Sequence, residues 1–214
     1  MSSRGLTRDV VELILGYGII LAAIWTPEAA QRVLSPIALV VTLAVVLARR
    51  PSRDELGFGP RGLLPSLWIL PAAIVFAAWS VLLAKHLGTL HPLYHPDVAH
   101  VAGYILWTLY QQFLVNDYFL PRLARVLGRD ALAVPATAVL FAGAHVPSPW
   151  LILATLVWGV ISCVLFRRYR NLWALGLAQG LLGLCFAACV PDALHHHLRV
   201  GLGYLRYHEA RSQP

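Results

Sequence analysis

Long hydrophobic runs separated by short polar connections are the dominant pattern of this 214-residue chain. Seven runs can be distinguished, at residues 10–25, 33–48, 63–84, 101–120, 131–144, 150–166 and 172–189. A hydrocarbon core of roughly 30 Å requires a helix of about 20 residues. Because isolated strands cannot satisfy their backbone hydrogen bonds in lipid, we expect all seven runs to be helices.

The pattern therefore predicts an all-α, polytopic membrane bundle of about seven transmembrane helices. Several runs are shorter than a full span, so six to eight helices agree with the same pattern. No internal repeat divides the chain, and a single membrane domain over residues 1–214 is expected. A short basic tail at 190–214 follows the last run, and 198–207 could form an amphipathic helix along the interface.

Composition supports a membrane protein, since 58% of the residues are hydrophobic and 13% are charged. Soluble domains carry roughly 25% charged residues. Asp9 and Glu12 interrupt the start of the first run, which argues for a retained span rather than a cleaved signal peptide. Cys163, Cys185 and Cys189 all lie inside apolar runs, so no disulfide framework is expected.

The net charge of +7 comes from short basic clusters between the hydrophobic runs, which argues against a nucleic-acid partner. The clusters alternate along the chain, and 12 of the 17 Lys and Arg residues fall in the N-terminal segment and the second, fourth and sixth connections. These are Arg4, Arg8, Arg49, Arg50, Arg53, Arg61, Arg122, Arg125, Arg129, Arg167, Arg168 and Arg170. Short cytoplasmic loops are enriched in Lys and Arg, so the N-terminus is predicted to be cytoplasmic.

Polar residues inside the runs mark the candidate chemistry. The fourth run carries Gln111 and Gln112, followed by Asn116 and Asp117 about one turn later. The seventh run carries Gln179, and His145 ends the fifth. Polar groups at membrane depth are costly, so they either link helices by hydrogen bonds or form a functional site. The pattern leaves both possibilities open.

The motif Phe141-x3-His145 is followed by Trp158-Gly159, by the basic Arg167-Arg168-Tyr169-Arg170, and by Asn171-Leu172-Trp173. In order and spacing these motifs resemble the CPBP intramembrane proteases. This family is also called CAAX-protease-like or Abi, and it includes the Ras-converting CAAX endopeptidase. The resemblance covers about residues 101–189, and it implies a CAAX-protease-like helical core there.

Other family positions are replaced in this chain. The resemblance places the family's two glutamates on Gln111 and Gln112, its arginine on Asn116, its second histidine on Gln179 and its last asparagine on Gly183. In the family, a glutamate and a histidine are thought to activate the water that hydrolyses a peptide. A glutamine amide cannot act as that general base near neutral pH. We therefore expect a pseudoprotease rather than a standard glutamic peptidase.

Three functional hypotheses remain. The first is a membrane protein that binds or acts on an isoprenoid, lipid or membrane peptide through Gln111, Gln112, Asn116 and Gln179. The second is an isoprenoid or lipid enzyme with Asp117 and His145 as catalytic residues, although Asp117 could equally pair with a nearby arginine, Arg122 or Arg125. The third is a residual intramembrane endopeptidase. Membrane lipid and a hydrophobic ligand or membrane peptide are the expected partners.

Histidines near the ends of the runs raise the question of a metal. They are His91, His95, His100, His195, His196 and His197. Imidazole groups suit transition metals, and a His-bound metal is an alternative basis for lipid chemistry. Pro92 and Pro96 prevent a regular helix through the first group, so these rings cannot be assumed to share a helix face. No cofactor is expected.

Overall fold

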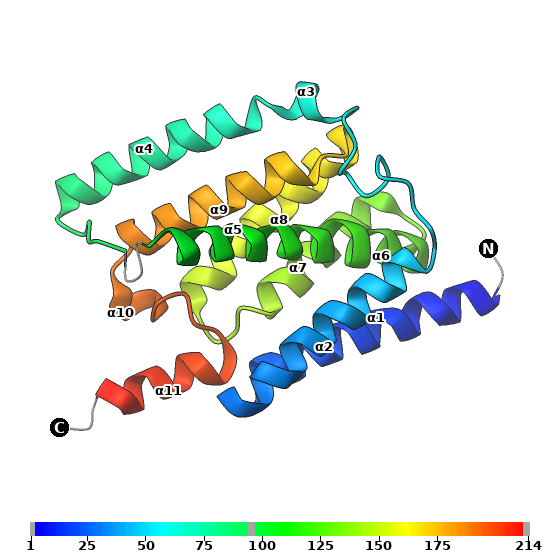
Figure 1. Ribbon diagram of the computed structural model, residues 1–214, viewed down its shortest axis with the longest axis horizontal. Helices are drawn as coiled ribbons and strands as arrows, with labels where there is room; N and C mark the ends of the chain where they lie inside the picture. Colours follow the sequence, from blue (N-terminus) through cyan, green and yellow to red (C-terminus); the bar gives the residue numbers. More distant parts are fainter. Residues whose placement is uncertain (1–2, 94–96, 212–214) are drawn as a thin grey trace. The chain divides into compact units, whose positions relative to one another are not determined.

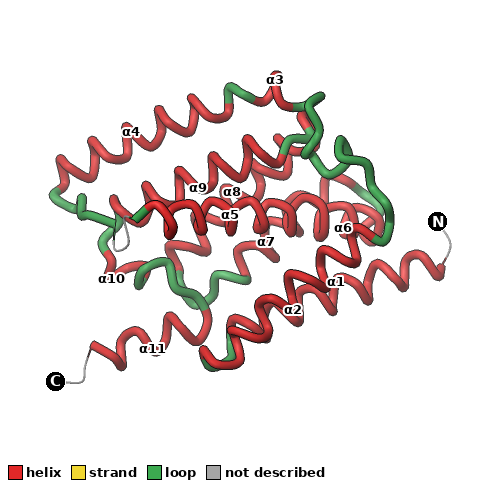
Figure 2. Tube along the Cα trace, viewed as in Figure 1, coloured by secondary structure: helices red, strands yellow, loops and turns green. Residues whose placement is uncertain are grey.

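The computed structural model describes residues 3–93 and 97–211, and all regular secondary structure within these ranges is helical (Figure 2). The helices in chain order are α1 (Ser3–Ile24), α2 (Glu28–Leu47), α3 (Leu63–Ser66), α4 (Ile69–Leu87), α5 (Val98–Phe113), the π-helical segment η1 (Leu114–Phe119), α6 (Leu120–Leu127), α7 (Asp130–Gly143), α8 (Pro149–Tyr169), α9 (Leu172–Cys189), α10 (Asp192–His195) and α11 (Gly201–Arg211).

Every hydrophobic run predicted from the sequence coincides with one or more of these helices, and the all-α fold class is confirmed. Four helical stretches in the described residues are long and apolar enough to cross a membrane: Glu28–Leu47, Leu63–Leu87, Pro149–Tyr169 and Leu172–Cys189. The tail also contains a helix, α11, where an interfacial segment was considered. Its position at an interface stays a prediction.

Contacts between residues group the chain into two compact units. The first unit comprises residues 1–51, 114–163 and 199–214, and the second comprises 52–113 and 164–198. The predicted single membrane domain over residues 1–214 stays a prediction.

In the first unit, α1 and α2 pack side by side, and α6 packs against both α1 and α7 (Figure 1). A buried apolar cluster joins η1, α6, α7 and α8. Its buried members are Val115, Leu120, Ala133, Val134, Phe141 and Cys163. Cys163 is a free cysteine that is buried in this cluster.

The close approach of α1 to the segment before α6 depends on a glycine. A Cβ atom added to Gly16 would overlap the ring of Tyr118, and the Tyr118 hydroxyl donates a hydrogen bond to the carbonyl oxygen of Glu12. One residue further on, Tyr17 and Phe119 meet edge to face with ring centroids 6.0 Å apart. Small residues allow helices to approach this closely in lipid.

In the second unit, both α4 and α5 pack against α9 (Figure 1). α4 ends where Gly88 adopts a left-handed conformation with φ of 69°, which favours glycine. Asn171 caps the N-terminus of α9, because its side-chain oxygen accepts a hydrogen bond from the Ala174 amide at 2.9 Å.

Candidate functional site

Three glycines on α9 bring α5 into contact with it. A Cβ atom at Gly176 would overlap Leu109, one at Gly180 would lie 3.2 Å from both Ile105 Cγ1 and Thr108 Oγ1, and one at Gly183 would overlap the Tyr104 hydroxyl. The Thr108 hydroxyl also donates to the carbonyl oxygen of Gly176 at 2.9 Å. Close packing of α5 on α9 therefore requires the absence of side chains at these three positions.

This contact brings three predicted site residues together in what we call the carboxamide cluster, formed by Gln111 and Gln112 of α5 and Gln179 of α9. Gln112 donates from Nε2 to Oε1 of Gln179, and Gln179 donates from Nε2 to Oε1 of Gln111, both at 2.5 Å. Gln112 is fully buried, whereas Gln111 and Gln179 are partly buried. The central amide of Gln179 thus acts as both donor and acceptor.

The carboxamide cluster is chemically neutral. An amide offers N–H donors and a carbonyl acceptor but no basic nitrogen, so no member of the cluster can abstract a proton from water near neutral pH. The two hydrogen bonds within the cluster join both amides of α5 to the amide of α9. It can orient a polar group of a ligand by hydrogen bonding, but it cannot supply a general base.

His145 belongs to the first unit and follows the end of α7 directly. Its Nδ1 lies 2.8 Å from the carbonyl oxygen of Phe141, and its ring meets the Phe141 ring edge to face, with centroids 5.1 Å apart. Because a carbonyl oxygen can only accept, Nδ1 carries the hydrogen, and Nε2 is the acceptor in the neutral ring. Phe141 therefore positions His145 through both its main chain and its ring, which gives the Phe-x3-His spacing a physical basis.

Asn116 and Asp117 also lie in the first unit, within the π-helical segment η1. All six residues of η1 are buried, and the segment packs against α2, α6 and α7. A π-helical turn inside a helix accommodates an extra residue and often occurs at functional sites. The side chains of Asn116 and Asp117 are 2% and 8% exposed, so neither carboxylate nor amide is a solvated surface group.

An ion-pair network connects α1, α6 and the end of α2 in the same unit. Arg125 donates from Nε and Nη2 to the two carboxylate oxygens of Asp9 at 2.6 and 2.9 Å. Arg122 donates from Nε to Oε2 of Glu12 at 2.7 Å. Arg49, just after α2, contacts both carboxylates at 2.6 and 2.8 Å. Arg122 and Arg125, the arginines considered as partners of Asp117, thus pair with Glu12 and Asp9. Nη1 of Arg122 also lies 3.4 Å from the main-chain carbonyl oxygen of Asp117.

The network shifts the acidity of Asp9, which precedes the first hydrophobic run. Hydrogen bonding from Arg125 is the largest cause that lowers the pKa of Asp9, and Arg49 contributes further, so the pKa falls to about 2 despite burial of the carboxyl group. Asp9 therefore stays charged over the physiological pH range.

Sequence reasoning missed this network. Asp9 and Glu12 are spaced i, i+3 on α1, and Arg122 and Arg125 have the same spacing on α6. Such pairs share a helix face, so two acidic and two basic residues with equal spacing are a signal of facing helices. The signal was available, but it is weak without knowledge of which helices are neighbours.

The histidines considered for a metal are distributed over several contacts. In the second unit, His91 and His195 stack with centroids 6.5 Å apart, and both rings donate from Nε2 to the carbonyl oxygen of Val190. His100 pairs with Asp97 at 2.6 Å, and His197 lies 3.2 Å from Asp192. His95 lies outside the described residues. Within 3–93 and 97–211, no group of three or more His, Cys, Asp or Glu side chains could hold a metal ion.

The helical bundle with its apolar spans defines an integral membrane protein of the α-helical class. Residues 96–185 match the family described as type II CAAX prenyl endopeptidase Rce1-like. This match confirms the resemblance drawn from Phe141-x3-His145 and its neighbouring motifs, and it assigns the segment to the CAAX-protease-like family. Neither a curated protein nor a solved structure matches the chain.

Proposed function

We propose that this CAAX-protease-like membrane protein does not hydrolyse peptides and instead binds a hydrophobic ligand that carries one polar end. The carboxamide cluster is the observation that carries the proposal. Its members occupy the positions that the family resemblance assigns to two glutamates and a histidine, and they hydrogen-bond to one another as neutral groups. A neutral hydrogen-bonding cluster suits recognition of an ester, amide or hydroxyl group.

The ligand class follows from the surroundings. In lipid, a site on α5 and α9 is reached by molecules that partition into the bilayer, so an isoprenoid, a lipid or a membrane peptide is the expected class. Gln179 is the central residue because it uses both ends of its amide within the cluster. Replacing it with Leu removes two hydrogen bonds while leaving an apolar side chain of similar length.

A photoreactive farnesyl probe tests binding. The purified protein in mild detergent is labelled with a diazirine-bearing farnesyl cysteine ester, with unlabelled ester as competitor. We expect saturable labelling that falls on the order of tenfold in Gln179→Leu, the loss expected when about 1.4 kcal/mol of hydrogen bonding is removed. Trp173→Leu, an exposed position on α9, is the matched control and should label like the wild type. Labelling that no competitor reduces would contradict ligand binding.

Proteolysis is tested separately with a fluorogenic prenylated CAAX peptide. We expect no cleavage above that of empty detergent and no effect of His145→Ala. Cleavage by the wild-type protein that stops in His145→Ala would show a residual endopeptidase and refute the proposal. The triple variant Gln111→Glu, Gln112→Glu, Gln179→His carries the family's residue types at these three positions. Its cleavage of the same peptide is compared with that of the wild-type protein.

A second candidate function is acid catalysis on an isoprenoid or lipid. It is favoured by the burial of Asp117 in a π-helical segment and by the defined tautomer of His145. A carboxyl group in a dry site can stay protonated and act as an acid. Turnover of an isoprenoid alkene or epoxide that is lost in both Asp117→Asn and His145→Ala would favour this function over simple binding.

We also propose that the N-terminus is cytoplasmic. The support is the alternation of basic connections along the sequence. Single cysteines at Arg53 and Lys85, introduced after replacement of the three native cysteines, provide the test. A membrane-impermeant maleimide applied to intact cells should label the Lys85 position and not the Arg53 position, and the reverse pattern would invert the topology.

A further inference from the structure

The ion-pair network of the first unit carries more positive than negative charge. Two carboxylates, Asp9 and Glu12, are surrounded by the guanidinium groups of Arg8, Arg49, Arg122 and Arg125. Asp9 and Glu12 are 2% and 8% exposed and Arg122 is 1% exposed, so much of this charge is withdrawn from water. Buried charge requires compensation by an opposite charge or by hydrogen bonds. The excess positive charge lies on the more exposed members of the network, since Arg8, Arg49 and Arg125 are 59%, 32% and 33% exposed, and it is therefore accessible to an anionic ligand.

One atom of the network shows this excess directly. Nη2 of Arg122 is buried and has no hydrogen-bond partner among the described residues, while its Nε and Nη1 are occupied by Glu12 and by the main-chain carbonyl of Tyr118. Unsatisfied donors of a buried guanidinium are costly. The network therefore has more cationic donors than its two carboxylates use, although Arg122 does not itself line the groove on α1.

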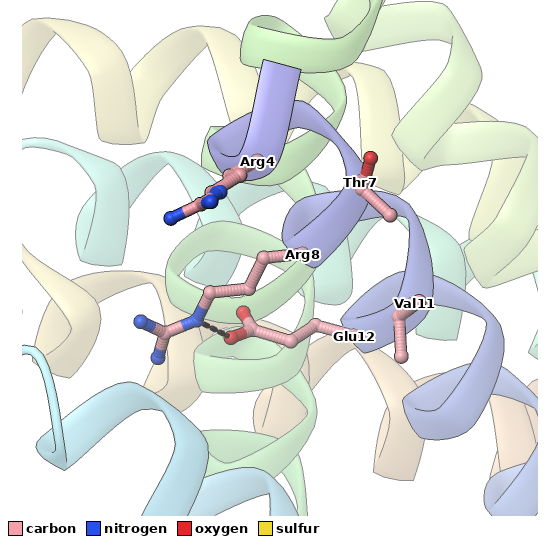
Figure 3. A pocket seen from close by; sticks show the side chains of 5 residues that line it. All are labelled: Arg4, Thr7, Arg8, Val11 and Glu12. Carbon is pink, nitrogen blue, oxygen red and sulfur yellow. Dashed lines mark hydrogen bonds and ion pairs between the residues drawn. The ribbon is translucent and has the colours of Figure 1, made fainter. Parts of the chain in front are cut away.

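A groove of about 450 Å³ lies on α1 next to Glu12 and is lined by Arg4, Thr7, Arg8, Val11 and Glu12 (Figure 3). Figure 3 shows the side chains of Arg4 and Arg8 extending to the same side of α1, with Arg8 bonded to Glu12. Arg8 is 59% exposed, so it has donors available to a ligand besides the one used at Glu12.

The same helix continues from this cationic end into an apolar face. Val11, Ile14 and Leu15 are 48%, 67% and 61% exposed. Positions 4, 8, 11 and 15 follow i, i+4, i+7 spacing and lie on one side of the helix. In a membrane protein such exposed apolar side chains face acyl chains. A molecule with a phosphate at one end and an acyl chain behind it matches both parts of this surface.

We infer that the groove on α1 binds the phosphate of an anionic phospholipid, with Arg4 and Arg8 as its contacts and Val11 and Leu15 beside its acyl chain. Arginine binds phosphate oxygens through charge-assisted hydrogen bonds, which are about twice as strong as neutral ones. Thr7 also lines the groove. This site is independent of the proposed function, because it uses none of the carboxamide residues.

Native mass spectrometry of the full chain in mild detergent tests the inference, with phosphatidylglycerol and phosphatidylcholine added at equal concentration. Both lipids carry the phosphate, but the choline cation of phosphatidylcholine is repelled by Arg4 and Arg8. We therefore expect phosphatidylglycerol adducts to exceed phosphatidylcholine adducts on the order of tenfold, which corresponds to about 1.4 kcal/mol. Equal adduct levels for the two lipids would overturn the proposal.

Two substitutions locate the site. Arg4→Gln removes one groove cation and leaves the ion pairs of Glu12 in place, so it should lower phosphatidylglycerol occupancy several-fold without changing the unfolding midpoint. Arg129→Gln is the matched control, because it removes one exposed cation from the connection after α6. An equal loss in both variants would show nonspecific attraction of acidic lipid and would overturn the assignment to the groove.

Competition with inorganic phosphate distinguishes a lipid ligand from a soluble anion. The comparison is needed because both carry a phosphate group. Inorganic phosphate at millimolar concentration should leave phosphatidylglycerol occupancy unchanged, because it lacks the acyl chain that contacts Val11 and Leu15. Displacement of phosphatidylglycerol by inorganic phosphate would identify a free-phosphate site and refute the lipid.

Discussion

Glu12 and Arg122 form a buried ion pair, with Nε of Arg122 2.7 Å from Oε2 of Glu12 across 110 positions of sequence. The side chains are 10% and 1% exposed, so the pair is largely removed from water. Together with Asp9 and Arg125 it sets the register of α1 against α6. The order of the partners is reversed along the two helices, which therefore run antiparallel.

Removing one partner of this pair should be strongly destabilising. In Arg122→Met the Glu12 carboxylate loses its most buried partner, and such changes cost about 3–5 kcal/mol. We expect a clear fall in the midpoint of thermal unfolding in detergent. Arg32→Gln is the control, because the Glu28–Arg32 pair is solvent-exposed and should leave the midpoint unchanged. An Arg122→Met protein as stable as the wild type would contradict the structural role of the pair.

Two glycines on α1 should respond in opposite ways to alanine. A methyl group at Gly16 overlaps the Tyr118 ring, and overpacking of this kind costs about 1–3 kcal/mol. At Gly18 nothing lies within 4 Å of the added Cβ, so Gly18→Ala should be neutral or stabilise the helix by about 0.5–1 kcal/mol. Chemical denaturation of both variants measures the difference. Equal effects would show that Tyr118 does not limit the approach of the helices.

The lowered pKa of Asp9 makes stability depend on acid pH. The folded-state pKa of about 2 lies below the ordinary value of 3.8, so the unfolded chain binds the proton more readily. The stabilisation is complete above about pH 4 and is lost as the pH falls towards about 2. Unfolding midpoints measured across this window should fall less steeply in Asp9→Asn than in the wild type. Identical slopes would contradict the ion pairing of Asp9.

We expect the stability to depend on pH a second time, at higher pH, because of His195. Its Nε2 donates to the Val190 carbonyl and its Nδ1 accepts from the Leu198 amide at 3.1 Å, which is the pattern of a neutral ring. Burial lowers the pKa of His195 below the ordinary 6.5, so the unfolded state binds more protons and stability falls as the pH drops below about 6.5.

Substitution separates His195 from other histidines. His195→Gln should reduce the loss of stability between pH 7 and 5, measured as the unfolding midpoint in detergent. His86→Gln, at an exposed position on α4, should retain the wild-type dependence. If His86→Gln alone flattened the profile, His195 would not be the titrating group.

The hydrophobic runs were enough to predict the helices, because transfer of an apolar segment into lipid depends on its own composition and length. The Phe141-x3-His145 motif and the motifs that follow it likewise indicated the family that residues 96–185 match. One turn of helix explains why the carbonyl and ring of Phe141 reach the imidazole of His145. The π-helical segment at Leu114–Phe119 was not predicted, since it depends on a local change of hydrogen-bond register that composition does not encode.

The candidate site was predicted only in part. Gln111, Gln112 and Gln179 were identified as unusual polar residues, but their hydrogen bonding to one another depends on which helices are neighbours. The hydrophobic pattern places Gln111 and Gln112 on one helix and Gln179 on another, but it does not predict that these two helices are in contact. The contact itself is made possible by Gly176, Gly180 and Gly183.

The sequence by itself determined the membrane character, the helical elements and the family of residues 96–185, because these depend on local composition and on motif spacing. The tertiary structure decided the partners of the charged residues. Asp9 and Glu12 could have paired with any nearby arginine, and the antiparallel packing of α1 on α6 selected Arg125 and Arg122. Electrostatic pairing acts over a few ångströms, so only the packed fold, and not the order of residues along the chain, specifies it.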